Sequence, residues 1–164
     1  MITNWLLDHP WATTAGLVTL LVAGPLVAAG LAGRPRAAWW LAALALVPVA
    51  VLTLSPGPGT VEDVRCTVQW ALPTLTRVEL LANVLLFVPP TLLATVASRC
   101  PWPVLLAGSG LSAAVEALQA VVPGIGRACD TTDWSSNTLG AAAGVGLAVL
   151  GLTLRRAVRA PSRH

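Results

Sequence analysis

The chain lacks lysine and tyrosine, and only 10% of its 164 residues are charged. A soluble domain carries roughly 25% charged residues, so this chain has too few polar groups to cover the surface of a soluble fold. Its apolar share of 55% and mean hydropathy of +0.75 indicate lipid as the surrounding solvent. The composition therefore excludes a soluble domain, and the length predicts one transmembrane domain over residues 1–164.

All of the basic residues are arginines, and the formal net charge is +3. A basic chain can indicate a nucleic-acid partner, but here the arginines cluster at the ends of apolar segments, where arginine is a topology signal. We therefore expect no nucleic-acid partner. The two histidines, His9 and His164, both lie in terminal segments, and we expect no metal site and no cofactor.

Apolar runs of the length needed to cross a bilayer, about 20 residues, recur along the chain. Such runs are Thr13–Leu31, Ala37–Leu54, Leu80–Ala97, Val104–Val122 and Thr138–Leu154. They predict an all-α polytopic membrane protein with five transmembrane helices. The start of the chain has no basic stretch of the kind that opens a signal peptide, so we expect the first run to remain as a helix. The sequence leaves open whether residues 68–75 re-enter the membrane.

The distribution of arginines predicts the orientation, because cytoplasmic loops carry the excess of basic residues. With the N-terminus outside and the C-terminus cytoplasmic, the inner segments hold Arg34, Arg36, Arg99, Arg155, Arg156, Arg159 and Arg163, and the outer segments hold Arg65, Arg77 and Arg127. The acidic residues Asp8, Glu62, Asp63, Glu79, Asp130 and Asp133 then all lie in outer segments. We expect this topology in the cytoplasmic (inner) membrane, with the arginine-rich tail against anionic lipid.

Two of the three cysteines, Cys66 and Cys129, fall in the two outer loops, whereas Cys100 falls in an inner one. Disulfides persist on the outer side of the membrane. We predict a bond between Cys66 and Cys129, with unpaired cysteines as the alternative.

Polar residues of the last three spans fall at one depth near the outer face. They are Glu79, Asn83, Ser112, Glu116, Gln119, Arg127, Asp130, Asp133 and Asn137. Ser112, Glu116 and Gln119 share one face of their helix, because residues three and four apart are neighbours. We predict a polar pocket formed by Asn83, Glu116, Gln119, Arg127, Asp133 and Asn137, with Glu79, Ser112 and Asp130 in support.

Glu116 is the most informative of these residues, because it lies about 9 Å inside the apolar boundary at 1.5 Å per residue. A charged group deep in the bilayer costs on the order of 3 kcal/mol unless it is paired. We expect Arg127 as its partner, with Arg77 second. Intramembrane ionisable residues are usually functional, so a functional role is favoured for Glu116 over a structural one.

Simpler explanations remain open for the other polar residues. Ser112 and Gln119 are explained by hydrogen bonds between helices. Asp133 suits the N-cap of the fifth helix, and Asp130 with Asp133 makes weak evidence for a divalent cation. Gly140 and Gly144 form a small-xxx-small pair, and packing within the monomer is favoured over a dimer interface; the oligomeric state stays open.

The ordered polar residues resemble the VanZ-like family of bacterial membrane proteins. The resemblance covers residues 79–150, the VanZ-like polar core, and rests on three stretches. They are Asn83-Val-Leu-Leu-Phe87-Val-Pro89, then Ser112-x-x-x-Glu116-x-x-Gln119, and then Arg127-x-x-Asp130-x-x-Asp133-x-x-x-Asn137-x-x-Gly140-x-x-x-Gly144. Pro90-Thr91 departs from the family, which commonly has an apolar residue followed by glycine there.

The resemblance implies a fold and a site more firmly than a reaction. The family is named after a protein associated with resistance to the glycopeptide teicoplanin. We therefore expect a pocket in the outer leaflet that binds a lipid headgroup, a lipid-linked cell-wall precursor or a glycopeptide. The alternative is a membrane-embedded enzyme acting on a lipid or lipid-linked substrate, with Glu116 as general acid or base. The sequence shows no evident activated nucleophile, and a channel or transporter ranks third.

Overall fold

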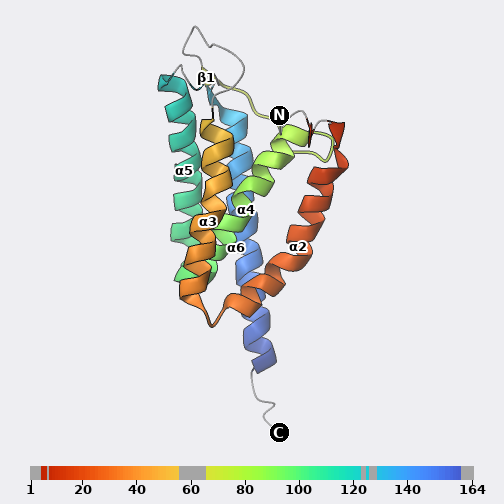
Figure 1. Cartoon of the computed structure of the whole chain (residues 1–164), viewed down its shortest axis with the longest axis vertical. Helices are drawn as coiled ribbons and strands as arrows, with labels where there is room; N and C mark the ends of the chain where they lie inside the picture. The colour runs from red at the N-terminus through yellow and green to blue at the C-terminus, as the bar shows by residue number, and fades with distance from the viewer. Residues whose placement is uncertain (1–4, 7, 56–65, 123–124, 126–128, 160–164) are drawn as a thin grey trace.

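The computed structural model describes residues 5–6, 8–55, 66–122, 125 and 129–159. Its long helices are α2 (Trp11–Leu31), α3 (Pro35–Leu54), α4 (Val78–Ser98), α5 (Pro101–Val121) and α6 (Thr131–Arg159). Each of these five is long and apolar enough to cross a membrane. The all-helical fold and the five spans predicted from the sequence are confirmed, and Figure 1 shows the helices side by side in one bundle.

Local sequence explains where several helices begin and end. Pro35 and Pro101 occupy the first positions of α3 and α5, where the missing N–H of proline costs nothing. Helix α4 ends at Arg99, which has a left-handed backbone with φ 62°. A left-handed residue is the common way to terminate a helix, although glycine usually fills that position.

The start of the last helix differs from the sequence expectation. Hydropathy predicts that the fifth span begins at Thr138, but α6 begins at Thr131. The intervening residues are polar, so hydropathy excludes them, yet several of them are buried and hydrogen-bonded in the bundle. The acidic and amide side chains at 133 and 137 therefore lie on the helix itself.

Helices α4 and α6 form the centre of the bundle, whereas α2 and α3 are the most exposed spans. Gly140 and Gly144 lie against the backbone of α4, where a Cβ atom at either position would clash with a carbonyl oxygen, that of Val84 or of Val88. Further along the helix, Gly151 lies in the same way against Pro25 of α2. The small-residue pattern thus serves packing within the chain, as small residues let helix backbones approach closely.

Two short strands lie at one end of the bundle. Strand β1 (Cys66–Thr67) pairs in parallel with β2 (Cys129–Asp130), and Cys66 is opposite Cys129 in the register. These two cysteines are joined by a disulfide, as the sequence predicts. We call this end, comprising β1, β2, residues 68–77 and the first turns of α4 and α6, the disulfide end.

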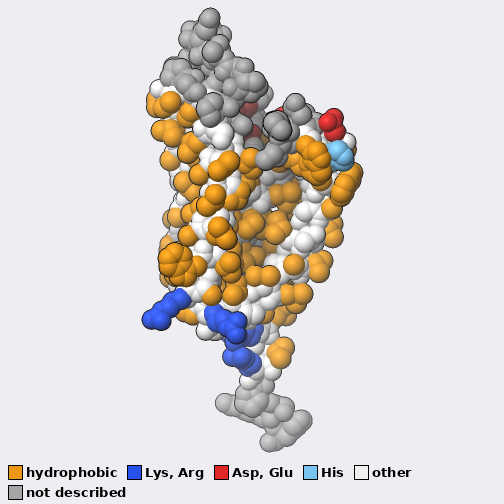
Figure 2. Space-filling view, viewed as in Figure 1, with side chains coloured by type: hydrophobic (Ala, Val, Ile, Leu, Met, Phe, Trp, Pro, Cys, Tyr) orange, Lys and Arg blue, Asp and Glu red, His pale blue; other side chains and the backbone are white. Residues whose placement is uncertain are grey.

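The opposite end carries arginines and is called the arginine end, comprising Arg34, Arg36, Arg99, Arg155, Arg156 and Arg159. Figure 2 shows basic side chains gathered there, a broad hydrophobic surface over the middle of the helices, and acidic side chains towards the disulfide end. Such a belt between two polar ends suits a multi-pass membrane protein. Cys100 is a free, exposed cysteine at the arginine end.

Candidate functional site

The candidate site is built around Asp130, the last residue of β2. One carboxylate oxygen of Asp130 accepts a hydrogen bond from the backbone N–H of Thr132 at 2.7 Å. Asp130 therefore fills the N-cap position of α6, which presents N–H groups with no partner in the helix. The N-cap role suggested from the sequence as one explanation of Asp133 is wrong, because α6 begins at Thr131 and Asp133 lies within the helix.

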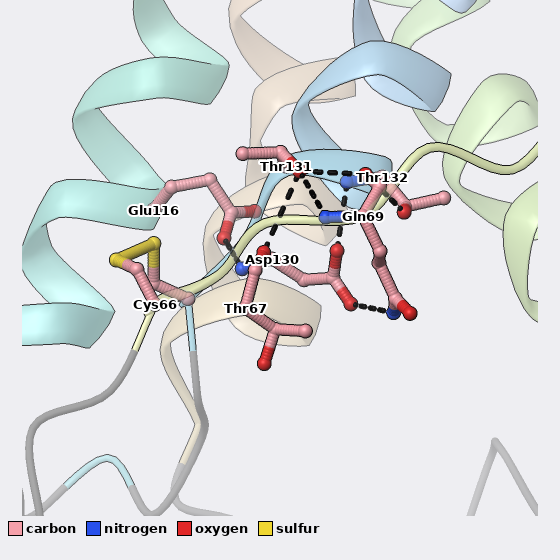
Figure 3. The surroundings of a disulfide bond; sticks show 8 residues. Cys66, Thr67, Gln69, Glu116, Asp130, Thr131 and Thr132 are labelled. Carbon is pink, nitrogen blue, oxygen red and sulfur yellow. Dashed lines mark hydrogen bonds between the residues drawn. A yellow bond between two sulfur atoms is a disulfide. The ribbon is translucent and has the colours of Figure 1, made fainter.

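The other carboxylate oxygen of Asp130 accepts a hydrogen bond from the side-chain amide of Gln69 at 2.7 Å. Gln69 is also held through its backbone, because its N–H donates to the Thr131 hydroxyl and its carbonyl accepts from the hydroxyls of Thr131 and Thr132. Figure 3 shows this network beside the disulfide, with Gln69 lying over the start of α6. The network fixes the segment after β1 against the last helix.

Glu116 lies on α5 and is 7% exposed. One of its carboxylate oxygens accepts a hydrogen bond from the backbone N–H of Asp130 at 2.8 Å, as Figure 3 shows. A carboxylate bonded to a backbone N–H is a strong, charge-assisted arrangement. Glu116 therefore holds β2 to α5. Arg127, its expected partner, lies outside the described residues.

Asn83 on α4 and Asp133 on α6 are brought together as the sequence suggests. The Asn83 amide donates to a carboxylate oxygen of Asp133 at 2.7 Å in a partly buried position. This bond joins the two central helices at the level of the disulfide end. Around Asp130 and Asp133, the described residues contain no group of three side chains suited to hold a metal ion.

Deeper in the bundle, the Asn137 amide donates to the hydroxyl of Ser112 at 3.0 Å, joining α6 to α5. Both side chains are buried, as is Ser136. The Asn137 Oδ1 atom and the Ser136 hydroxyl are buried without a hydrogen-bond partner in the described structure. Buried polar atoms without a partner are uncommon in proteins, so these two atoms mark an unusual polar position inside the bundle.

Gln119 points elsewhere. Its amide donates to the backbone carbonyl of Thr53 at 2.9 Å, and the side chain is 8% exposed. The bond connects α5 to α3 rather than to α4 or α6. Gln119 thus has the interhelical hydrogen-bonding role that is common for polar residues in membrane helices.

An open pocket of about 610 Å³ lies at the disulfide end, and we call it the polar pocket. Its described lining is Gln69, Trp70, Ala71, Thr76, Arg77, Val78, Glu79, Leu80, Asp130, Thr132 and Asp133. The pocket thus contains a guanidinium group, three carboxylates and an amide within one hollow.

A second hollow of about 330 Å³, the apolar groove, shares two of these residues. Its lining is Trp70, Ala71, Leu72, Trp134, Ser135, Thr138 and Leu139. The rings of Trp70 and Trp134 meet edge to face with centroids 6.2 Å apart, a favoured aromatic geometry. Trp70 and Ala71 therefore separate a charged hollow from an apolar one.

The structure divides the residues predicted from the sequence into two layers. Asp133, Glu79 and Asp130 line the polar pocket, whereas Glu116 and Asn137 lie buried behind it among hydrogen bonds. Sequence reasoning missed Gln69 and Trp70, which hydropathy marks only as a loop. The signal for them is the disulfide, because a bond at Cys66 brings the residues just after it to the start of α6.

Five apolar helices and a hydrophobic belt between two polar ends define a multi-pass membrane protein. Among known families, the sequence model of VanZ/LLP1 matches residues 17–153. The match covers most of the chain, so the protein belongs to the VanZ/LLP1 family. No curated protein and no solved structure matches the chain significantly.

Proposed function

We propose that this protein binds the polar head of an amphipathic molecule in the polar pocket and its apolar part in the apolar groove, without catalysing a reaction. A lipid, a lipid-linked cell-wall precursor or a lipoglycopeptide has the required chemistry. The observation that carries the proposal is the shared wall of the two hollows, Trp70 and Ala71. One ligand with a polar and an apolar part can occupy both.

The charges of the polar pocket suit a head with mixed character. Arg77 offers a planar fork of donors, which matches phosphate or carboxylate. Glu79, Asp130 and Asp133 are acceptors for hydroxyl, amide or ammonium groups. A phosphorylated sugar, a peptide or a zwitterionic headgroup presents both kinds of partner.

In the proposed topology the N-terminus and the disulfide end face the outside of the cytoplasmic membrane, and the C-terminus is cytoplasmic. The disulfide supports this assignment, because such bonds persist in oxidising compartments. The arginine end supports it too, since basic residues concentrate on the cytoplasmic side. The pocket would then open at the level of the outer leaflet, where lipid-linked precursors and glycopeptides meet the membrane.

The enzymatic alternative needs Glu116 to reach a substrate as general acid or base. Its carboxylate is instead buried and bonded to the backbone N–H of Asp130. The described lining of the polar pocket does not include it. This geometry favours a supporting role for Glu116 in a binding protein.

The test measures binding of three probes to the purified protein in lipid nanodiscs: phosphatidylethanolamine, a lipid-linked disaccharide-peptide and teicoplanin. We expect one of them to bind and Arg77→Ala to weaken its binding about tenfold, as expected for a lost charge-assisted bond. Leu72→Ala, at a residue that lines only the apolar groove, should weaken binding of the intact amphiphile but not of its water-soluble head alone. Arg77 and Glu79 are exposed, so substitutions there should leave the fold intact.

Arg34→Ala, at the arginine end, is the matched control and should bind like the wild type. Absence of binding for all three probes would contradict the proposal. Equal binding by Arg77→Ala, Glu79→Gln and the wild type would contradict the assignment of the pocket. Turnover of a bound probe would instead support the enzyme.

A further inference from the structure

A third pocket, of about 470 Å³, lies at the arginine end between three segments of the chain. It is lined by Ala32 and Gly33 of the turn between α2 and α3, by Arg99 at the end of α4, and by Leu152, Arg155, Arg156 and Arg159 of α6. We call it the arginine pocket. Figure 2 shows the basic side chains of this end grouped together, below the hydrophobic surface.

Two of these guanidinium groups are held in place by backbone carbonyls at the C-terminal end of α2. Arg155 Nη1 donates to the carbonyl of Ala29 at 2.7 Å, and Arg99 Nη2 donates to the carbonyl of Ala32. A guanidinium has five N–H donors, so each retains donors for another partner. The carbonyls carry only the partial negative charge of a helix C-terminus, so they do not pair either guanidinium with a full opposite charge.

The backbone also makes room for these side chains. Arg99 has a positive φ of 62°, uncommon for a residue other than glycine, and this conformation terminates α4 beside the turn. A Cβ atom on Gly33 would lie 3.2 Å from Arg155 Nη2. A larger side chain at position 33 would therefore clash with the guanidinium group of Arg155.

No acidic side chain lines this pocket in the described part of the chain. The described acids Asp8, Glu79, Asp130 and Asp133 belong to the N-terminal segment and the disulfide end, and Glu116 lies on α5 beside β2. Four arginines thus converge without a described counter-charge. Held, uncompensated guanidinium groups are suited to bind an anion with several oxygen atoms.

We propose that the arginine pocket binds a phosphate group, supplied by the headgroup of an anionic phospholipid or by free phosphate. The pocket lies where α6 leaves its apolar stretch, which the proposed topology puts near the lipid phosphates, and Leu152 contributes an apolar wall. Basic pockets between membrane helices bind such headgroups. The site differs from a general attraction of arginines to anionic lipid because it depends on the position of particular side chains. It stands independently of the polar pocket at the opposite end.

Native mass spectrometry of the full chain, released from nanodiscs of phosphatidylglycerol and phosphatidylcholine, tests the site. We expect one phosphatidylglycerol molecule to be retained preferentially. The double substitution Arg99→Gln with Arg155→Gln should lower its affinity at least about tenfold. The matched control, Arg34→Gln with Arg36→Gln, removes the same charge from the same end without touching the pocket lining, and should keep the wild-type affinity.

Gly33→Leu provides a second test that changes no charge. It should weaken retention of phosphatidylglycerol by filling the pocket, whereas attraction by charge alone would be unaffected. If both double substitutions reduce retention equally and Gly33→Leu has no effect, the arginines act only as a charged surface and the proposal fails. If the Gly33→Leu protein does not accumulate, comparing lipid retention by the two double-substituted proteins still tests the proposal.

Inorganic phosphate distinguishes the source of the group. Displacement of the retained lipid by inorganic phosphate at comparable concentration would support a site for free phosphate. Retention of the lipid in its presence would support a lipid site. Failure of both phosphatidylglycerol and inorganic phosphate to bind the wild type would overturn the proposal.

Discussion

The two ends of the bundle are built in opposite ways. At the disulfide end, carboxylates accept hydrogen bonds from backbone N–H groups and amides, and a covalent bond joins the loops. At the arginine end, guanidinium groups donate to backbone carbonyls at the C-terminal end of α2. The acidic end uses much of its hydrogen-bonding capacity to fix the chain, whereas the basic end retains donors. The comparison shows that the carboxylates of one end fix loops and also line a pocket, whereas the guanidinium groups of the other end make fewer contacts within the chain.

The largest expected effect is a difference in thiol labelling, because the two ends are proposed to lie on opposite sides of the membrane. Cys100 is free and exposed at the arginine end, so a membrane-impermeant maleimide should leave it unlabelled in intact cells and label it after permeabilisation. Thr76→Cys in a Cys100→Ser background supplies the control, because residue 76 is exposed at the disulfide end and should be labelled in intact cells. The reverse pattern would reverse the proposed orientation.

The disulfide is the next largest difference between the ends. Cys66 and Cys129 are 63 residues apart, and closing a loop of that length stabilises a folded chain by about 4 kcal/mol in the loop-entropy model. We expect Cys66→Ser with Cys129→Ser to lower the thermal midpoint strongly in fluorescence-detected size-exclusion chromatography. Cys100→Ser is the control and should not change it. An unchanged midpoint in the double variant would show that hydrogen bonds alone hold the disulfide end.

Leucine substitutions at the close glycine contacts of α6 are expected to destabilise the fold by similar amounts near either end. Gly144→Leu would force α6 away from α4, and Gly151→Leu would force it away from α2. Each should cost about 3 kcal/mol, as overpacking does. At Gly146 no atom lies within 4 Å of an added Cβ, so Gly146→Leu should leave the thermal midpoint unchanged or slightly raised. A cost at Gly144 but not at Gly151 would show that the disulfide end carries more of the packing.

Much of this fold follows from hydropathy, because a bilayer demands apolar runs of fixed length. The α3 span ends at Leu54 both in the sequence interpretation and in the structure. The start of α6 does not follow, since its first turns are polar and are buried by neighbouring helices rather than by lipid. Depth places Asn83 and Asp133 in one pocket, but it does not specify the hydrogen bond between them.

Other features depend on rotation of a helix about its axis, which depth does not specify. Gln119 shares a face with Glu116 on α5, yet it bonds to α3 while Glu116 bonds to β2. The arginine pocket joins residues 99 and 155 through a turn at 33, and no local pattern relates these three positions. The sequence shows which residues share a level, whereas the packed structure shows which of them meet.

The position of the disulfide also sets an order of events during synthesis. Cys129 follows α4 and α5 in the chain, so in the proposed topology the bond to Cys66 requires that both helices have first been inserted. Until then, Gln69 has no Asp130 to bond. Oxidation of this cysteine pair therefore reports that the helical hairpin between them has been delivered to the membrane, and the polar pocket is completed late in biogenesis.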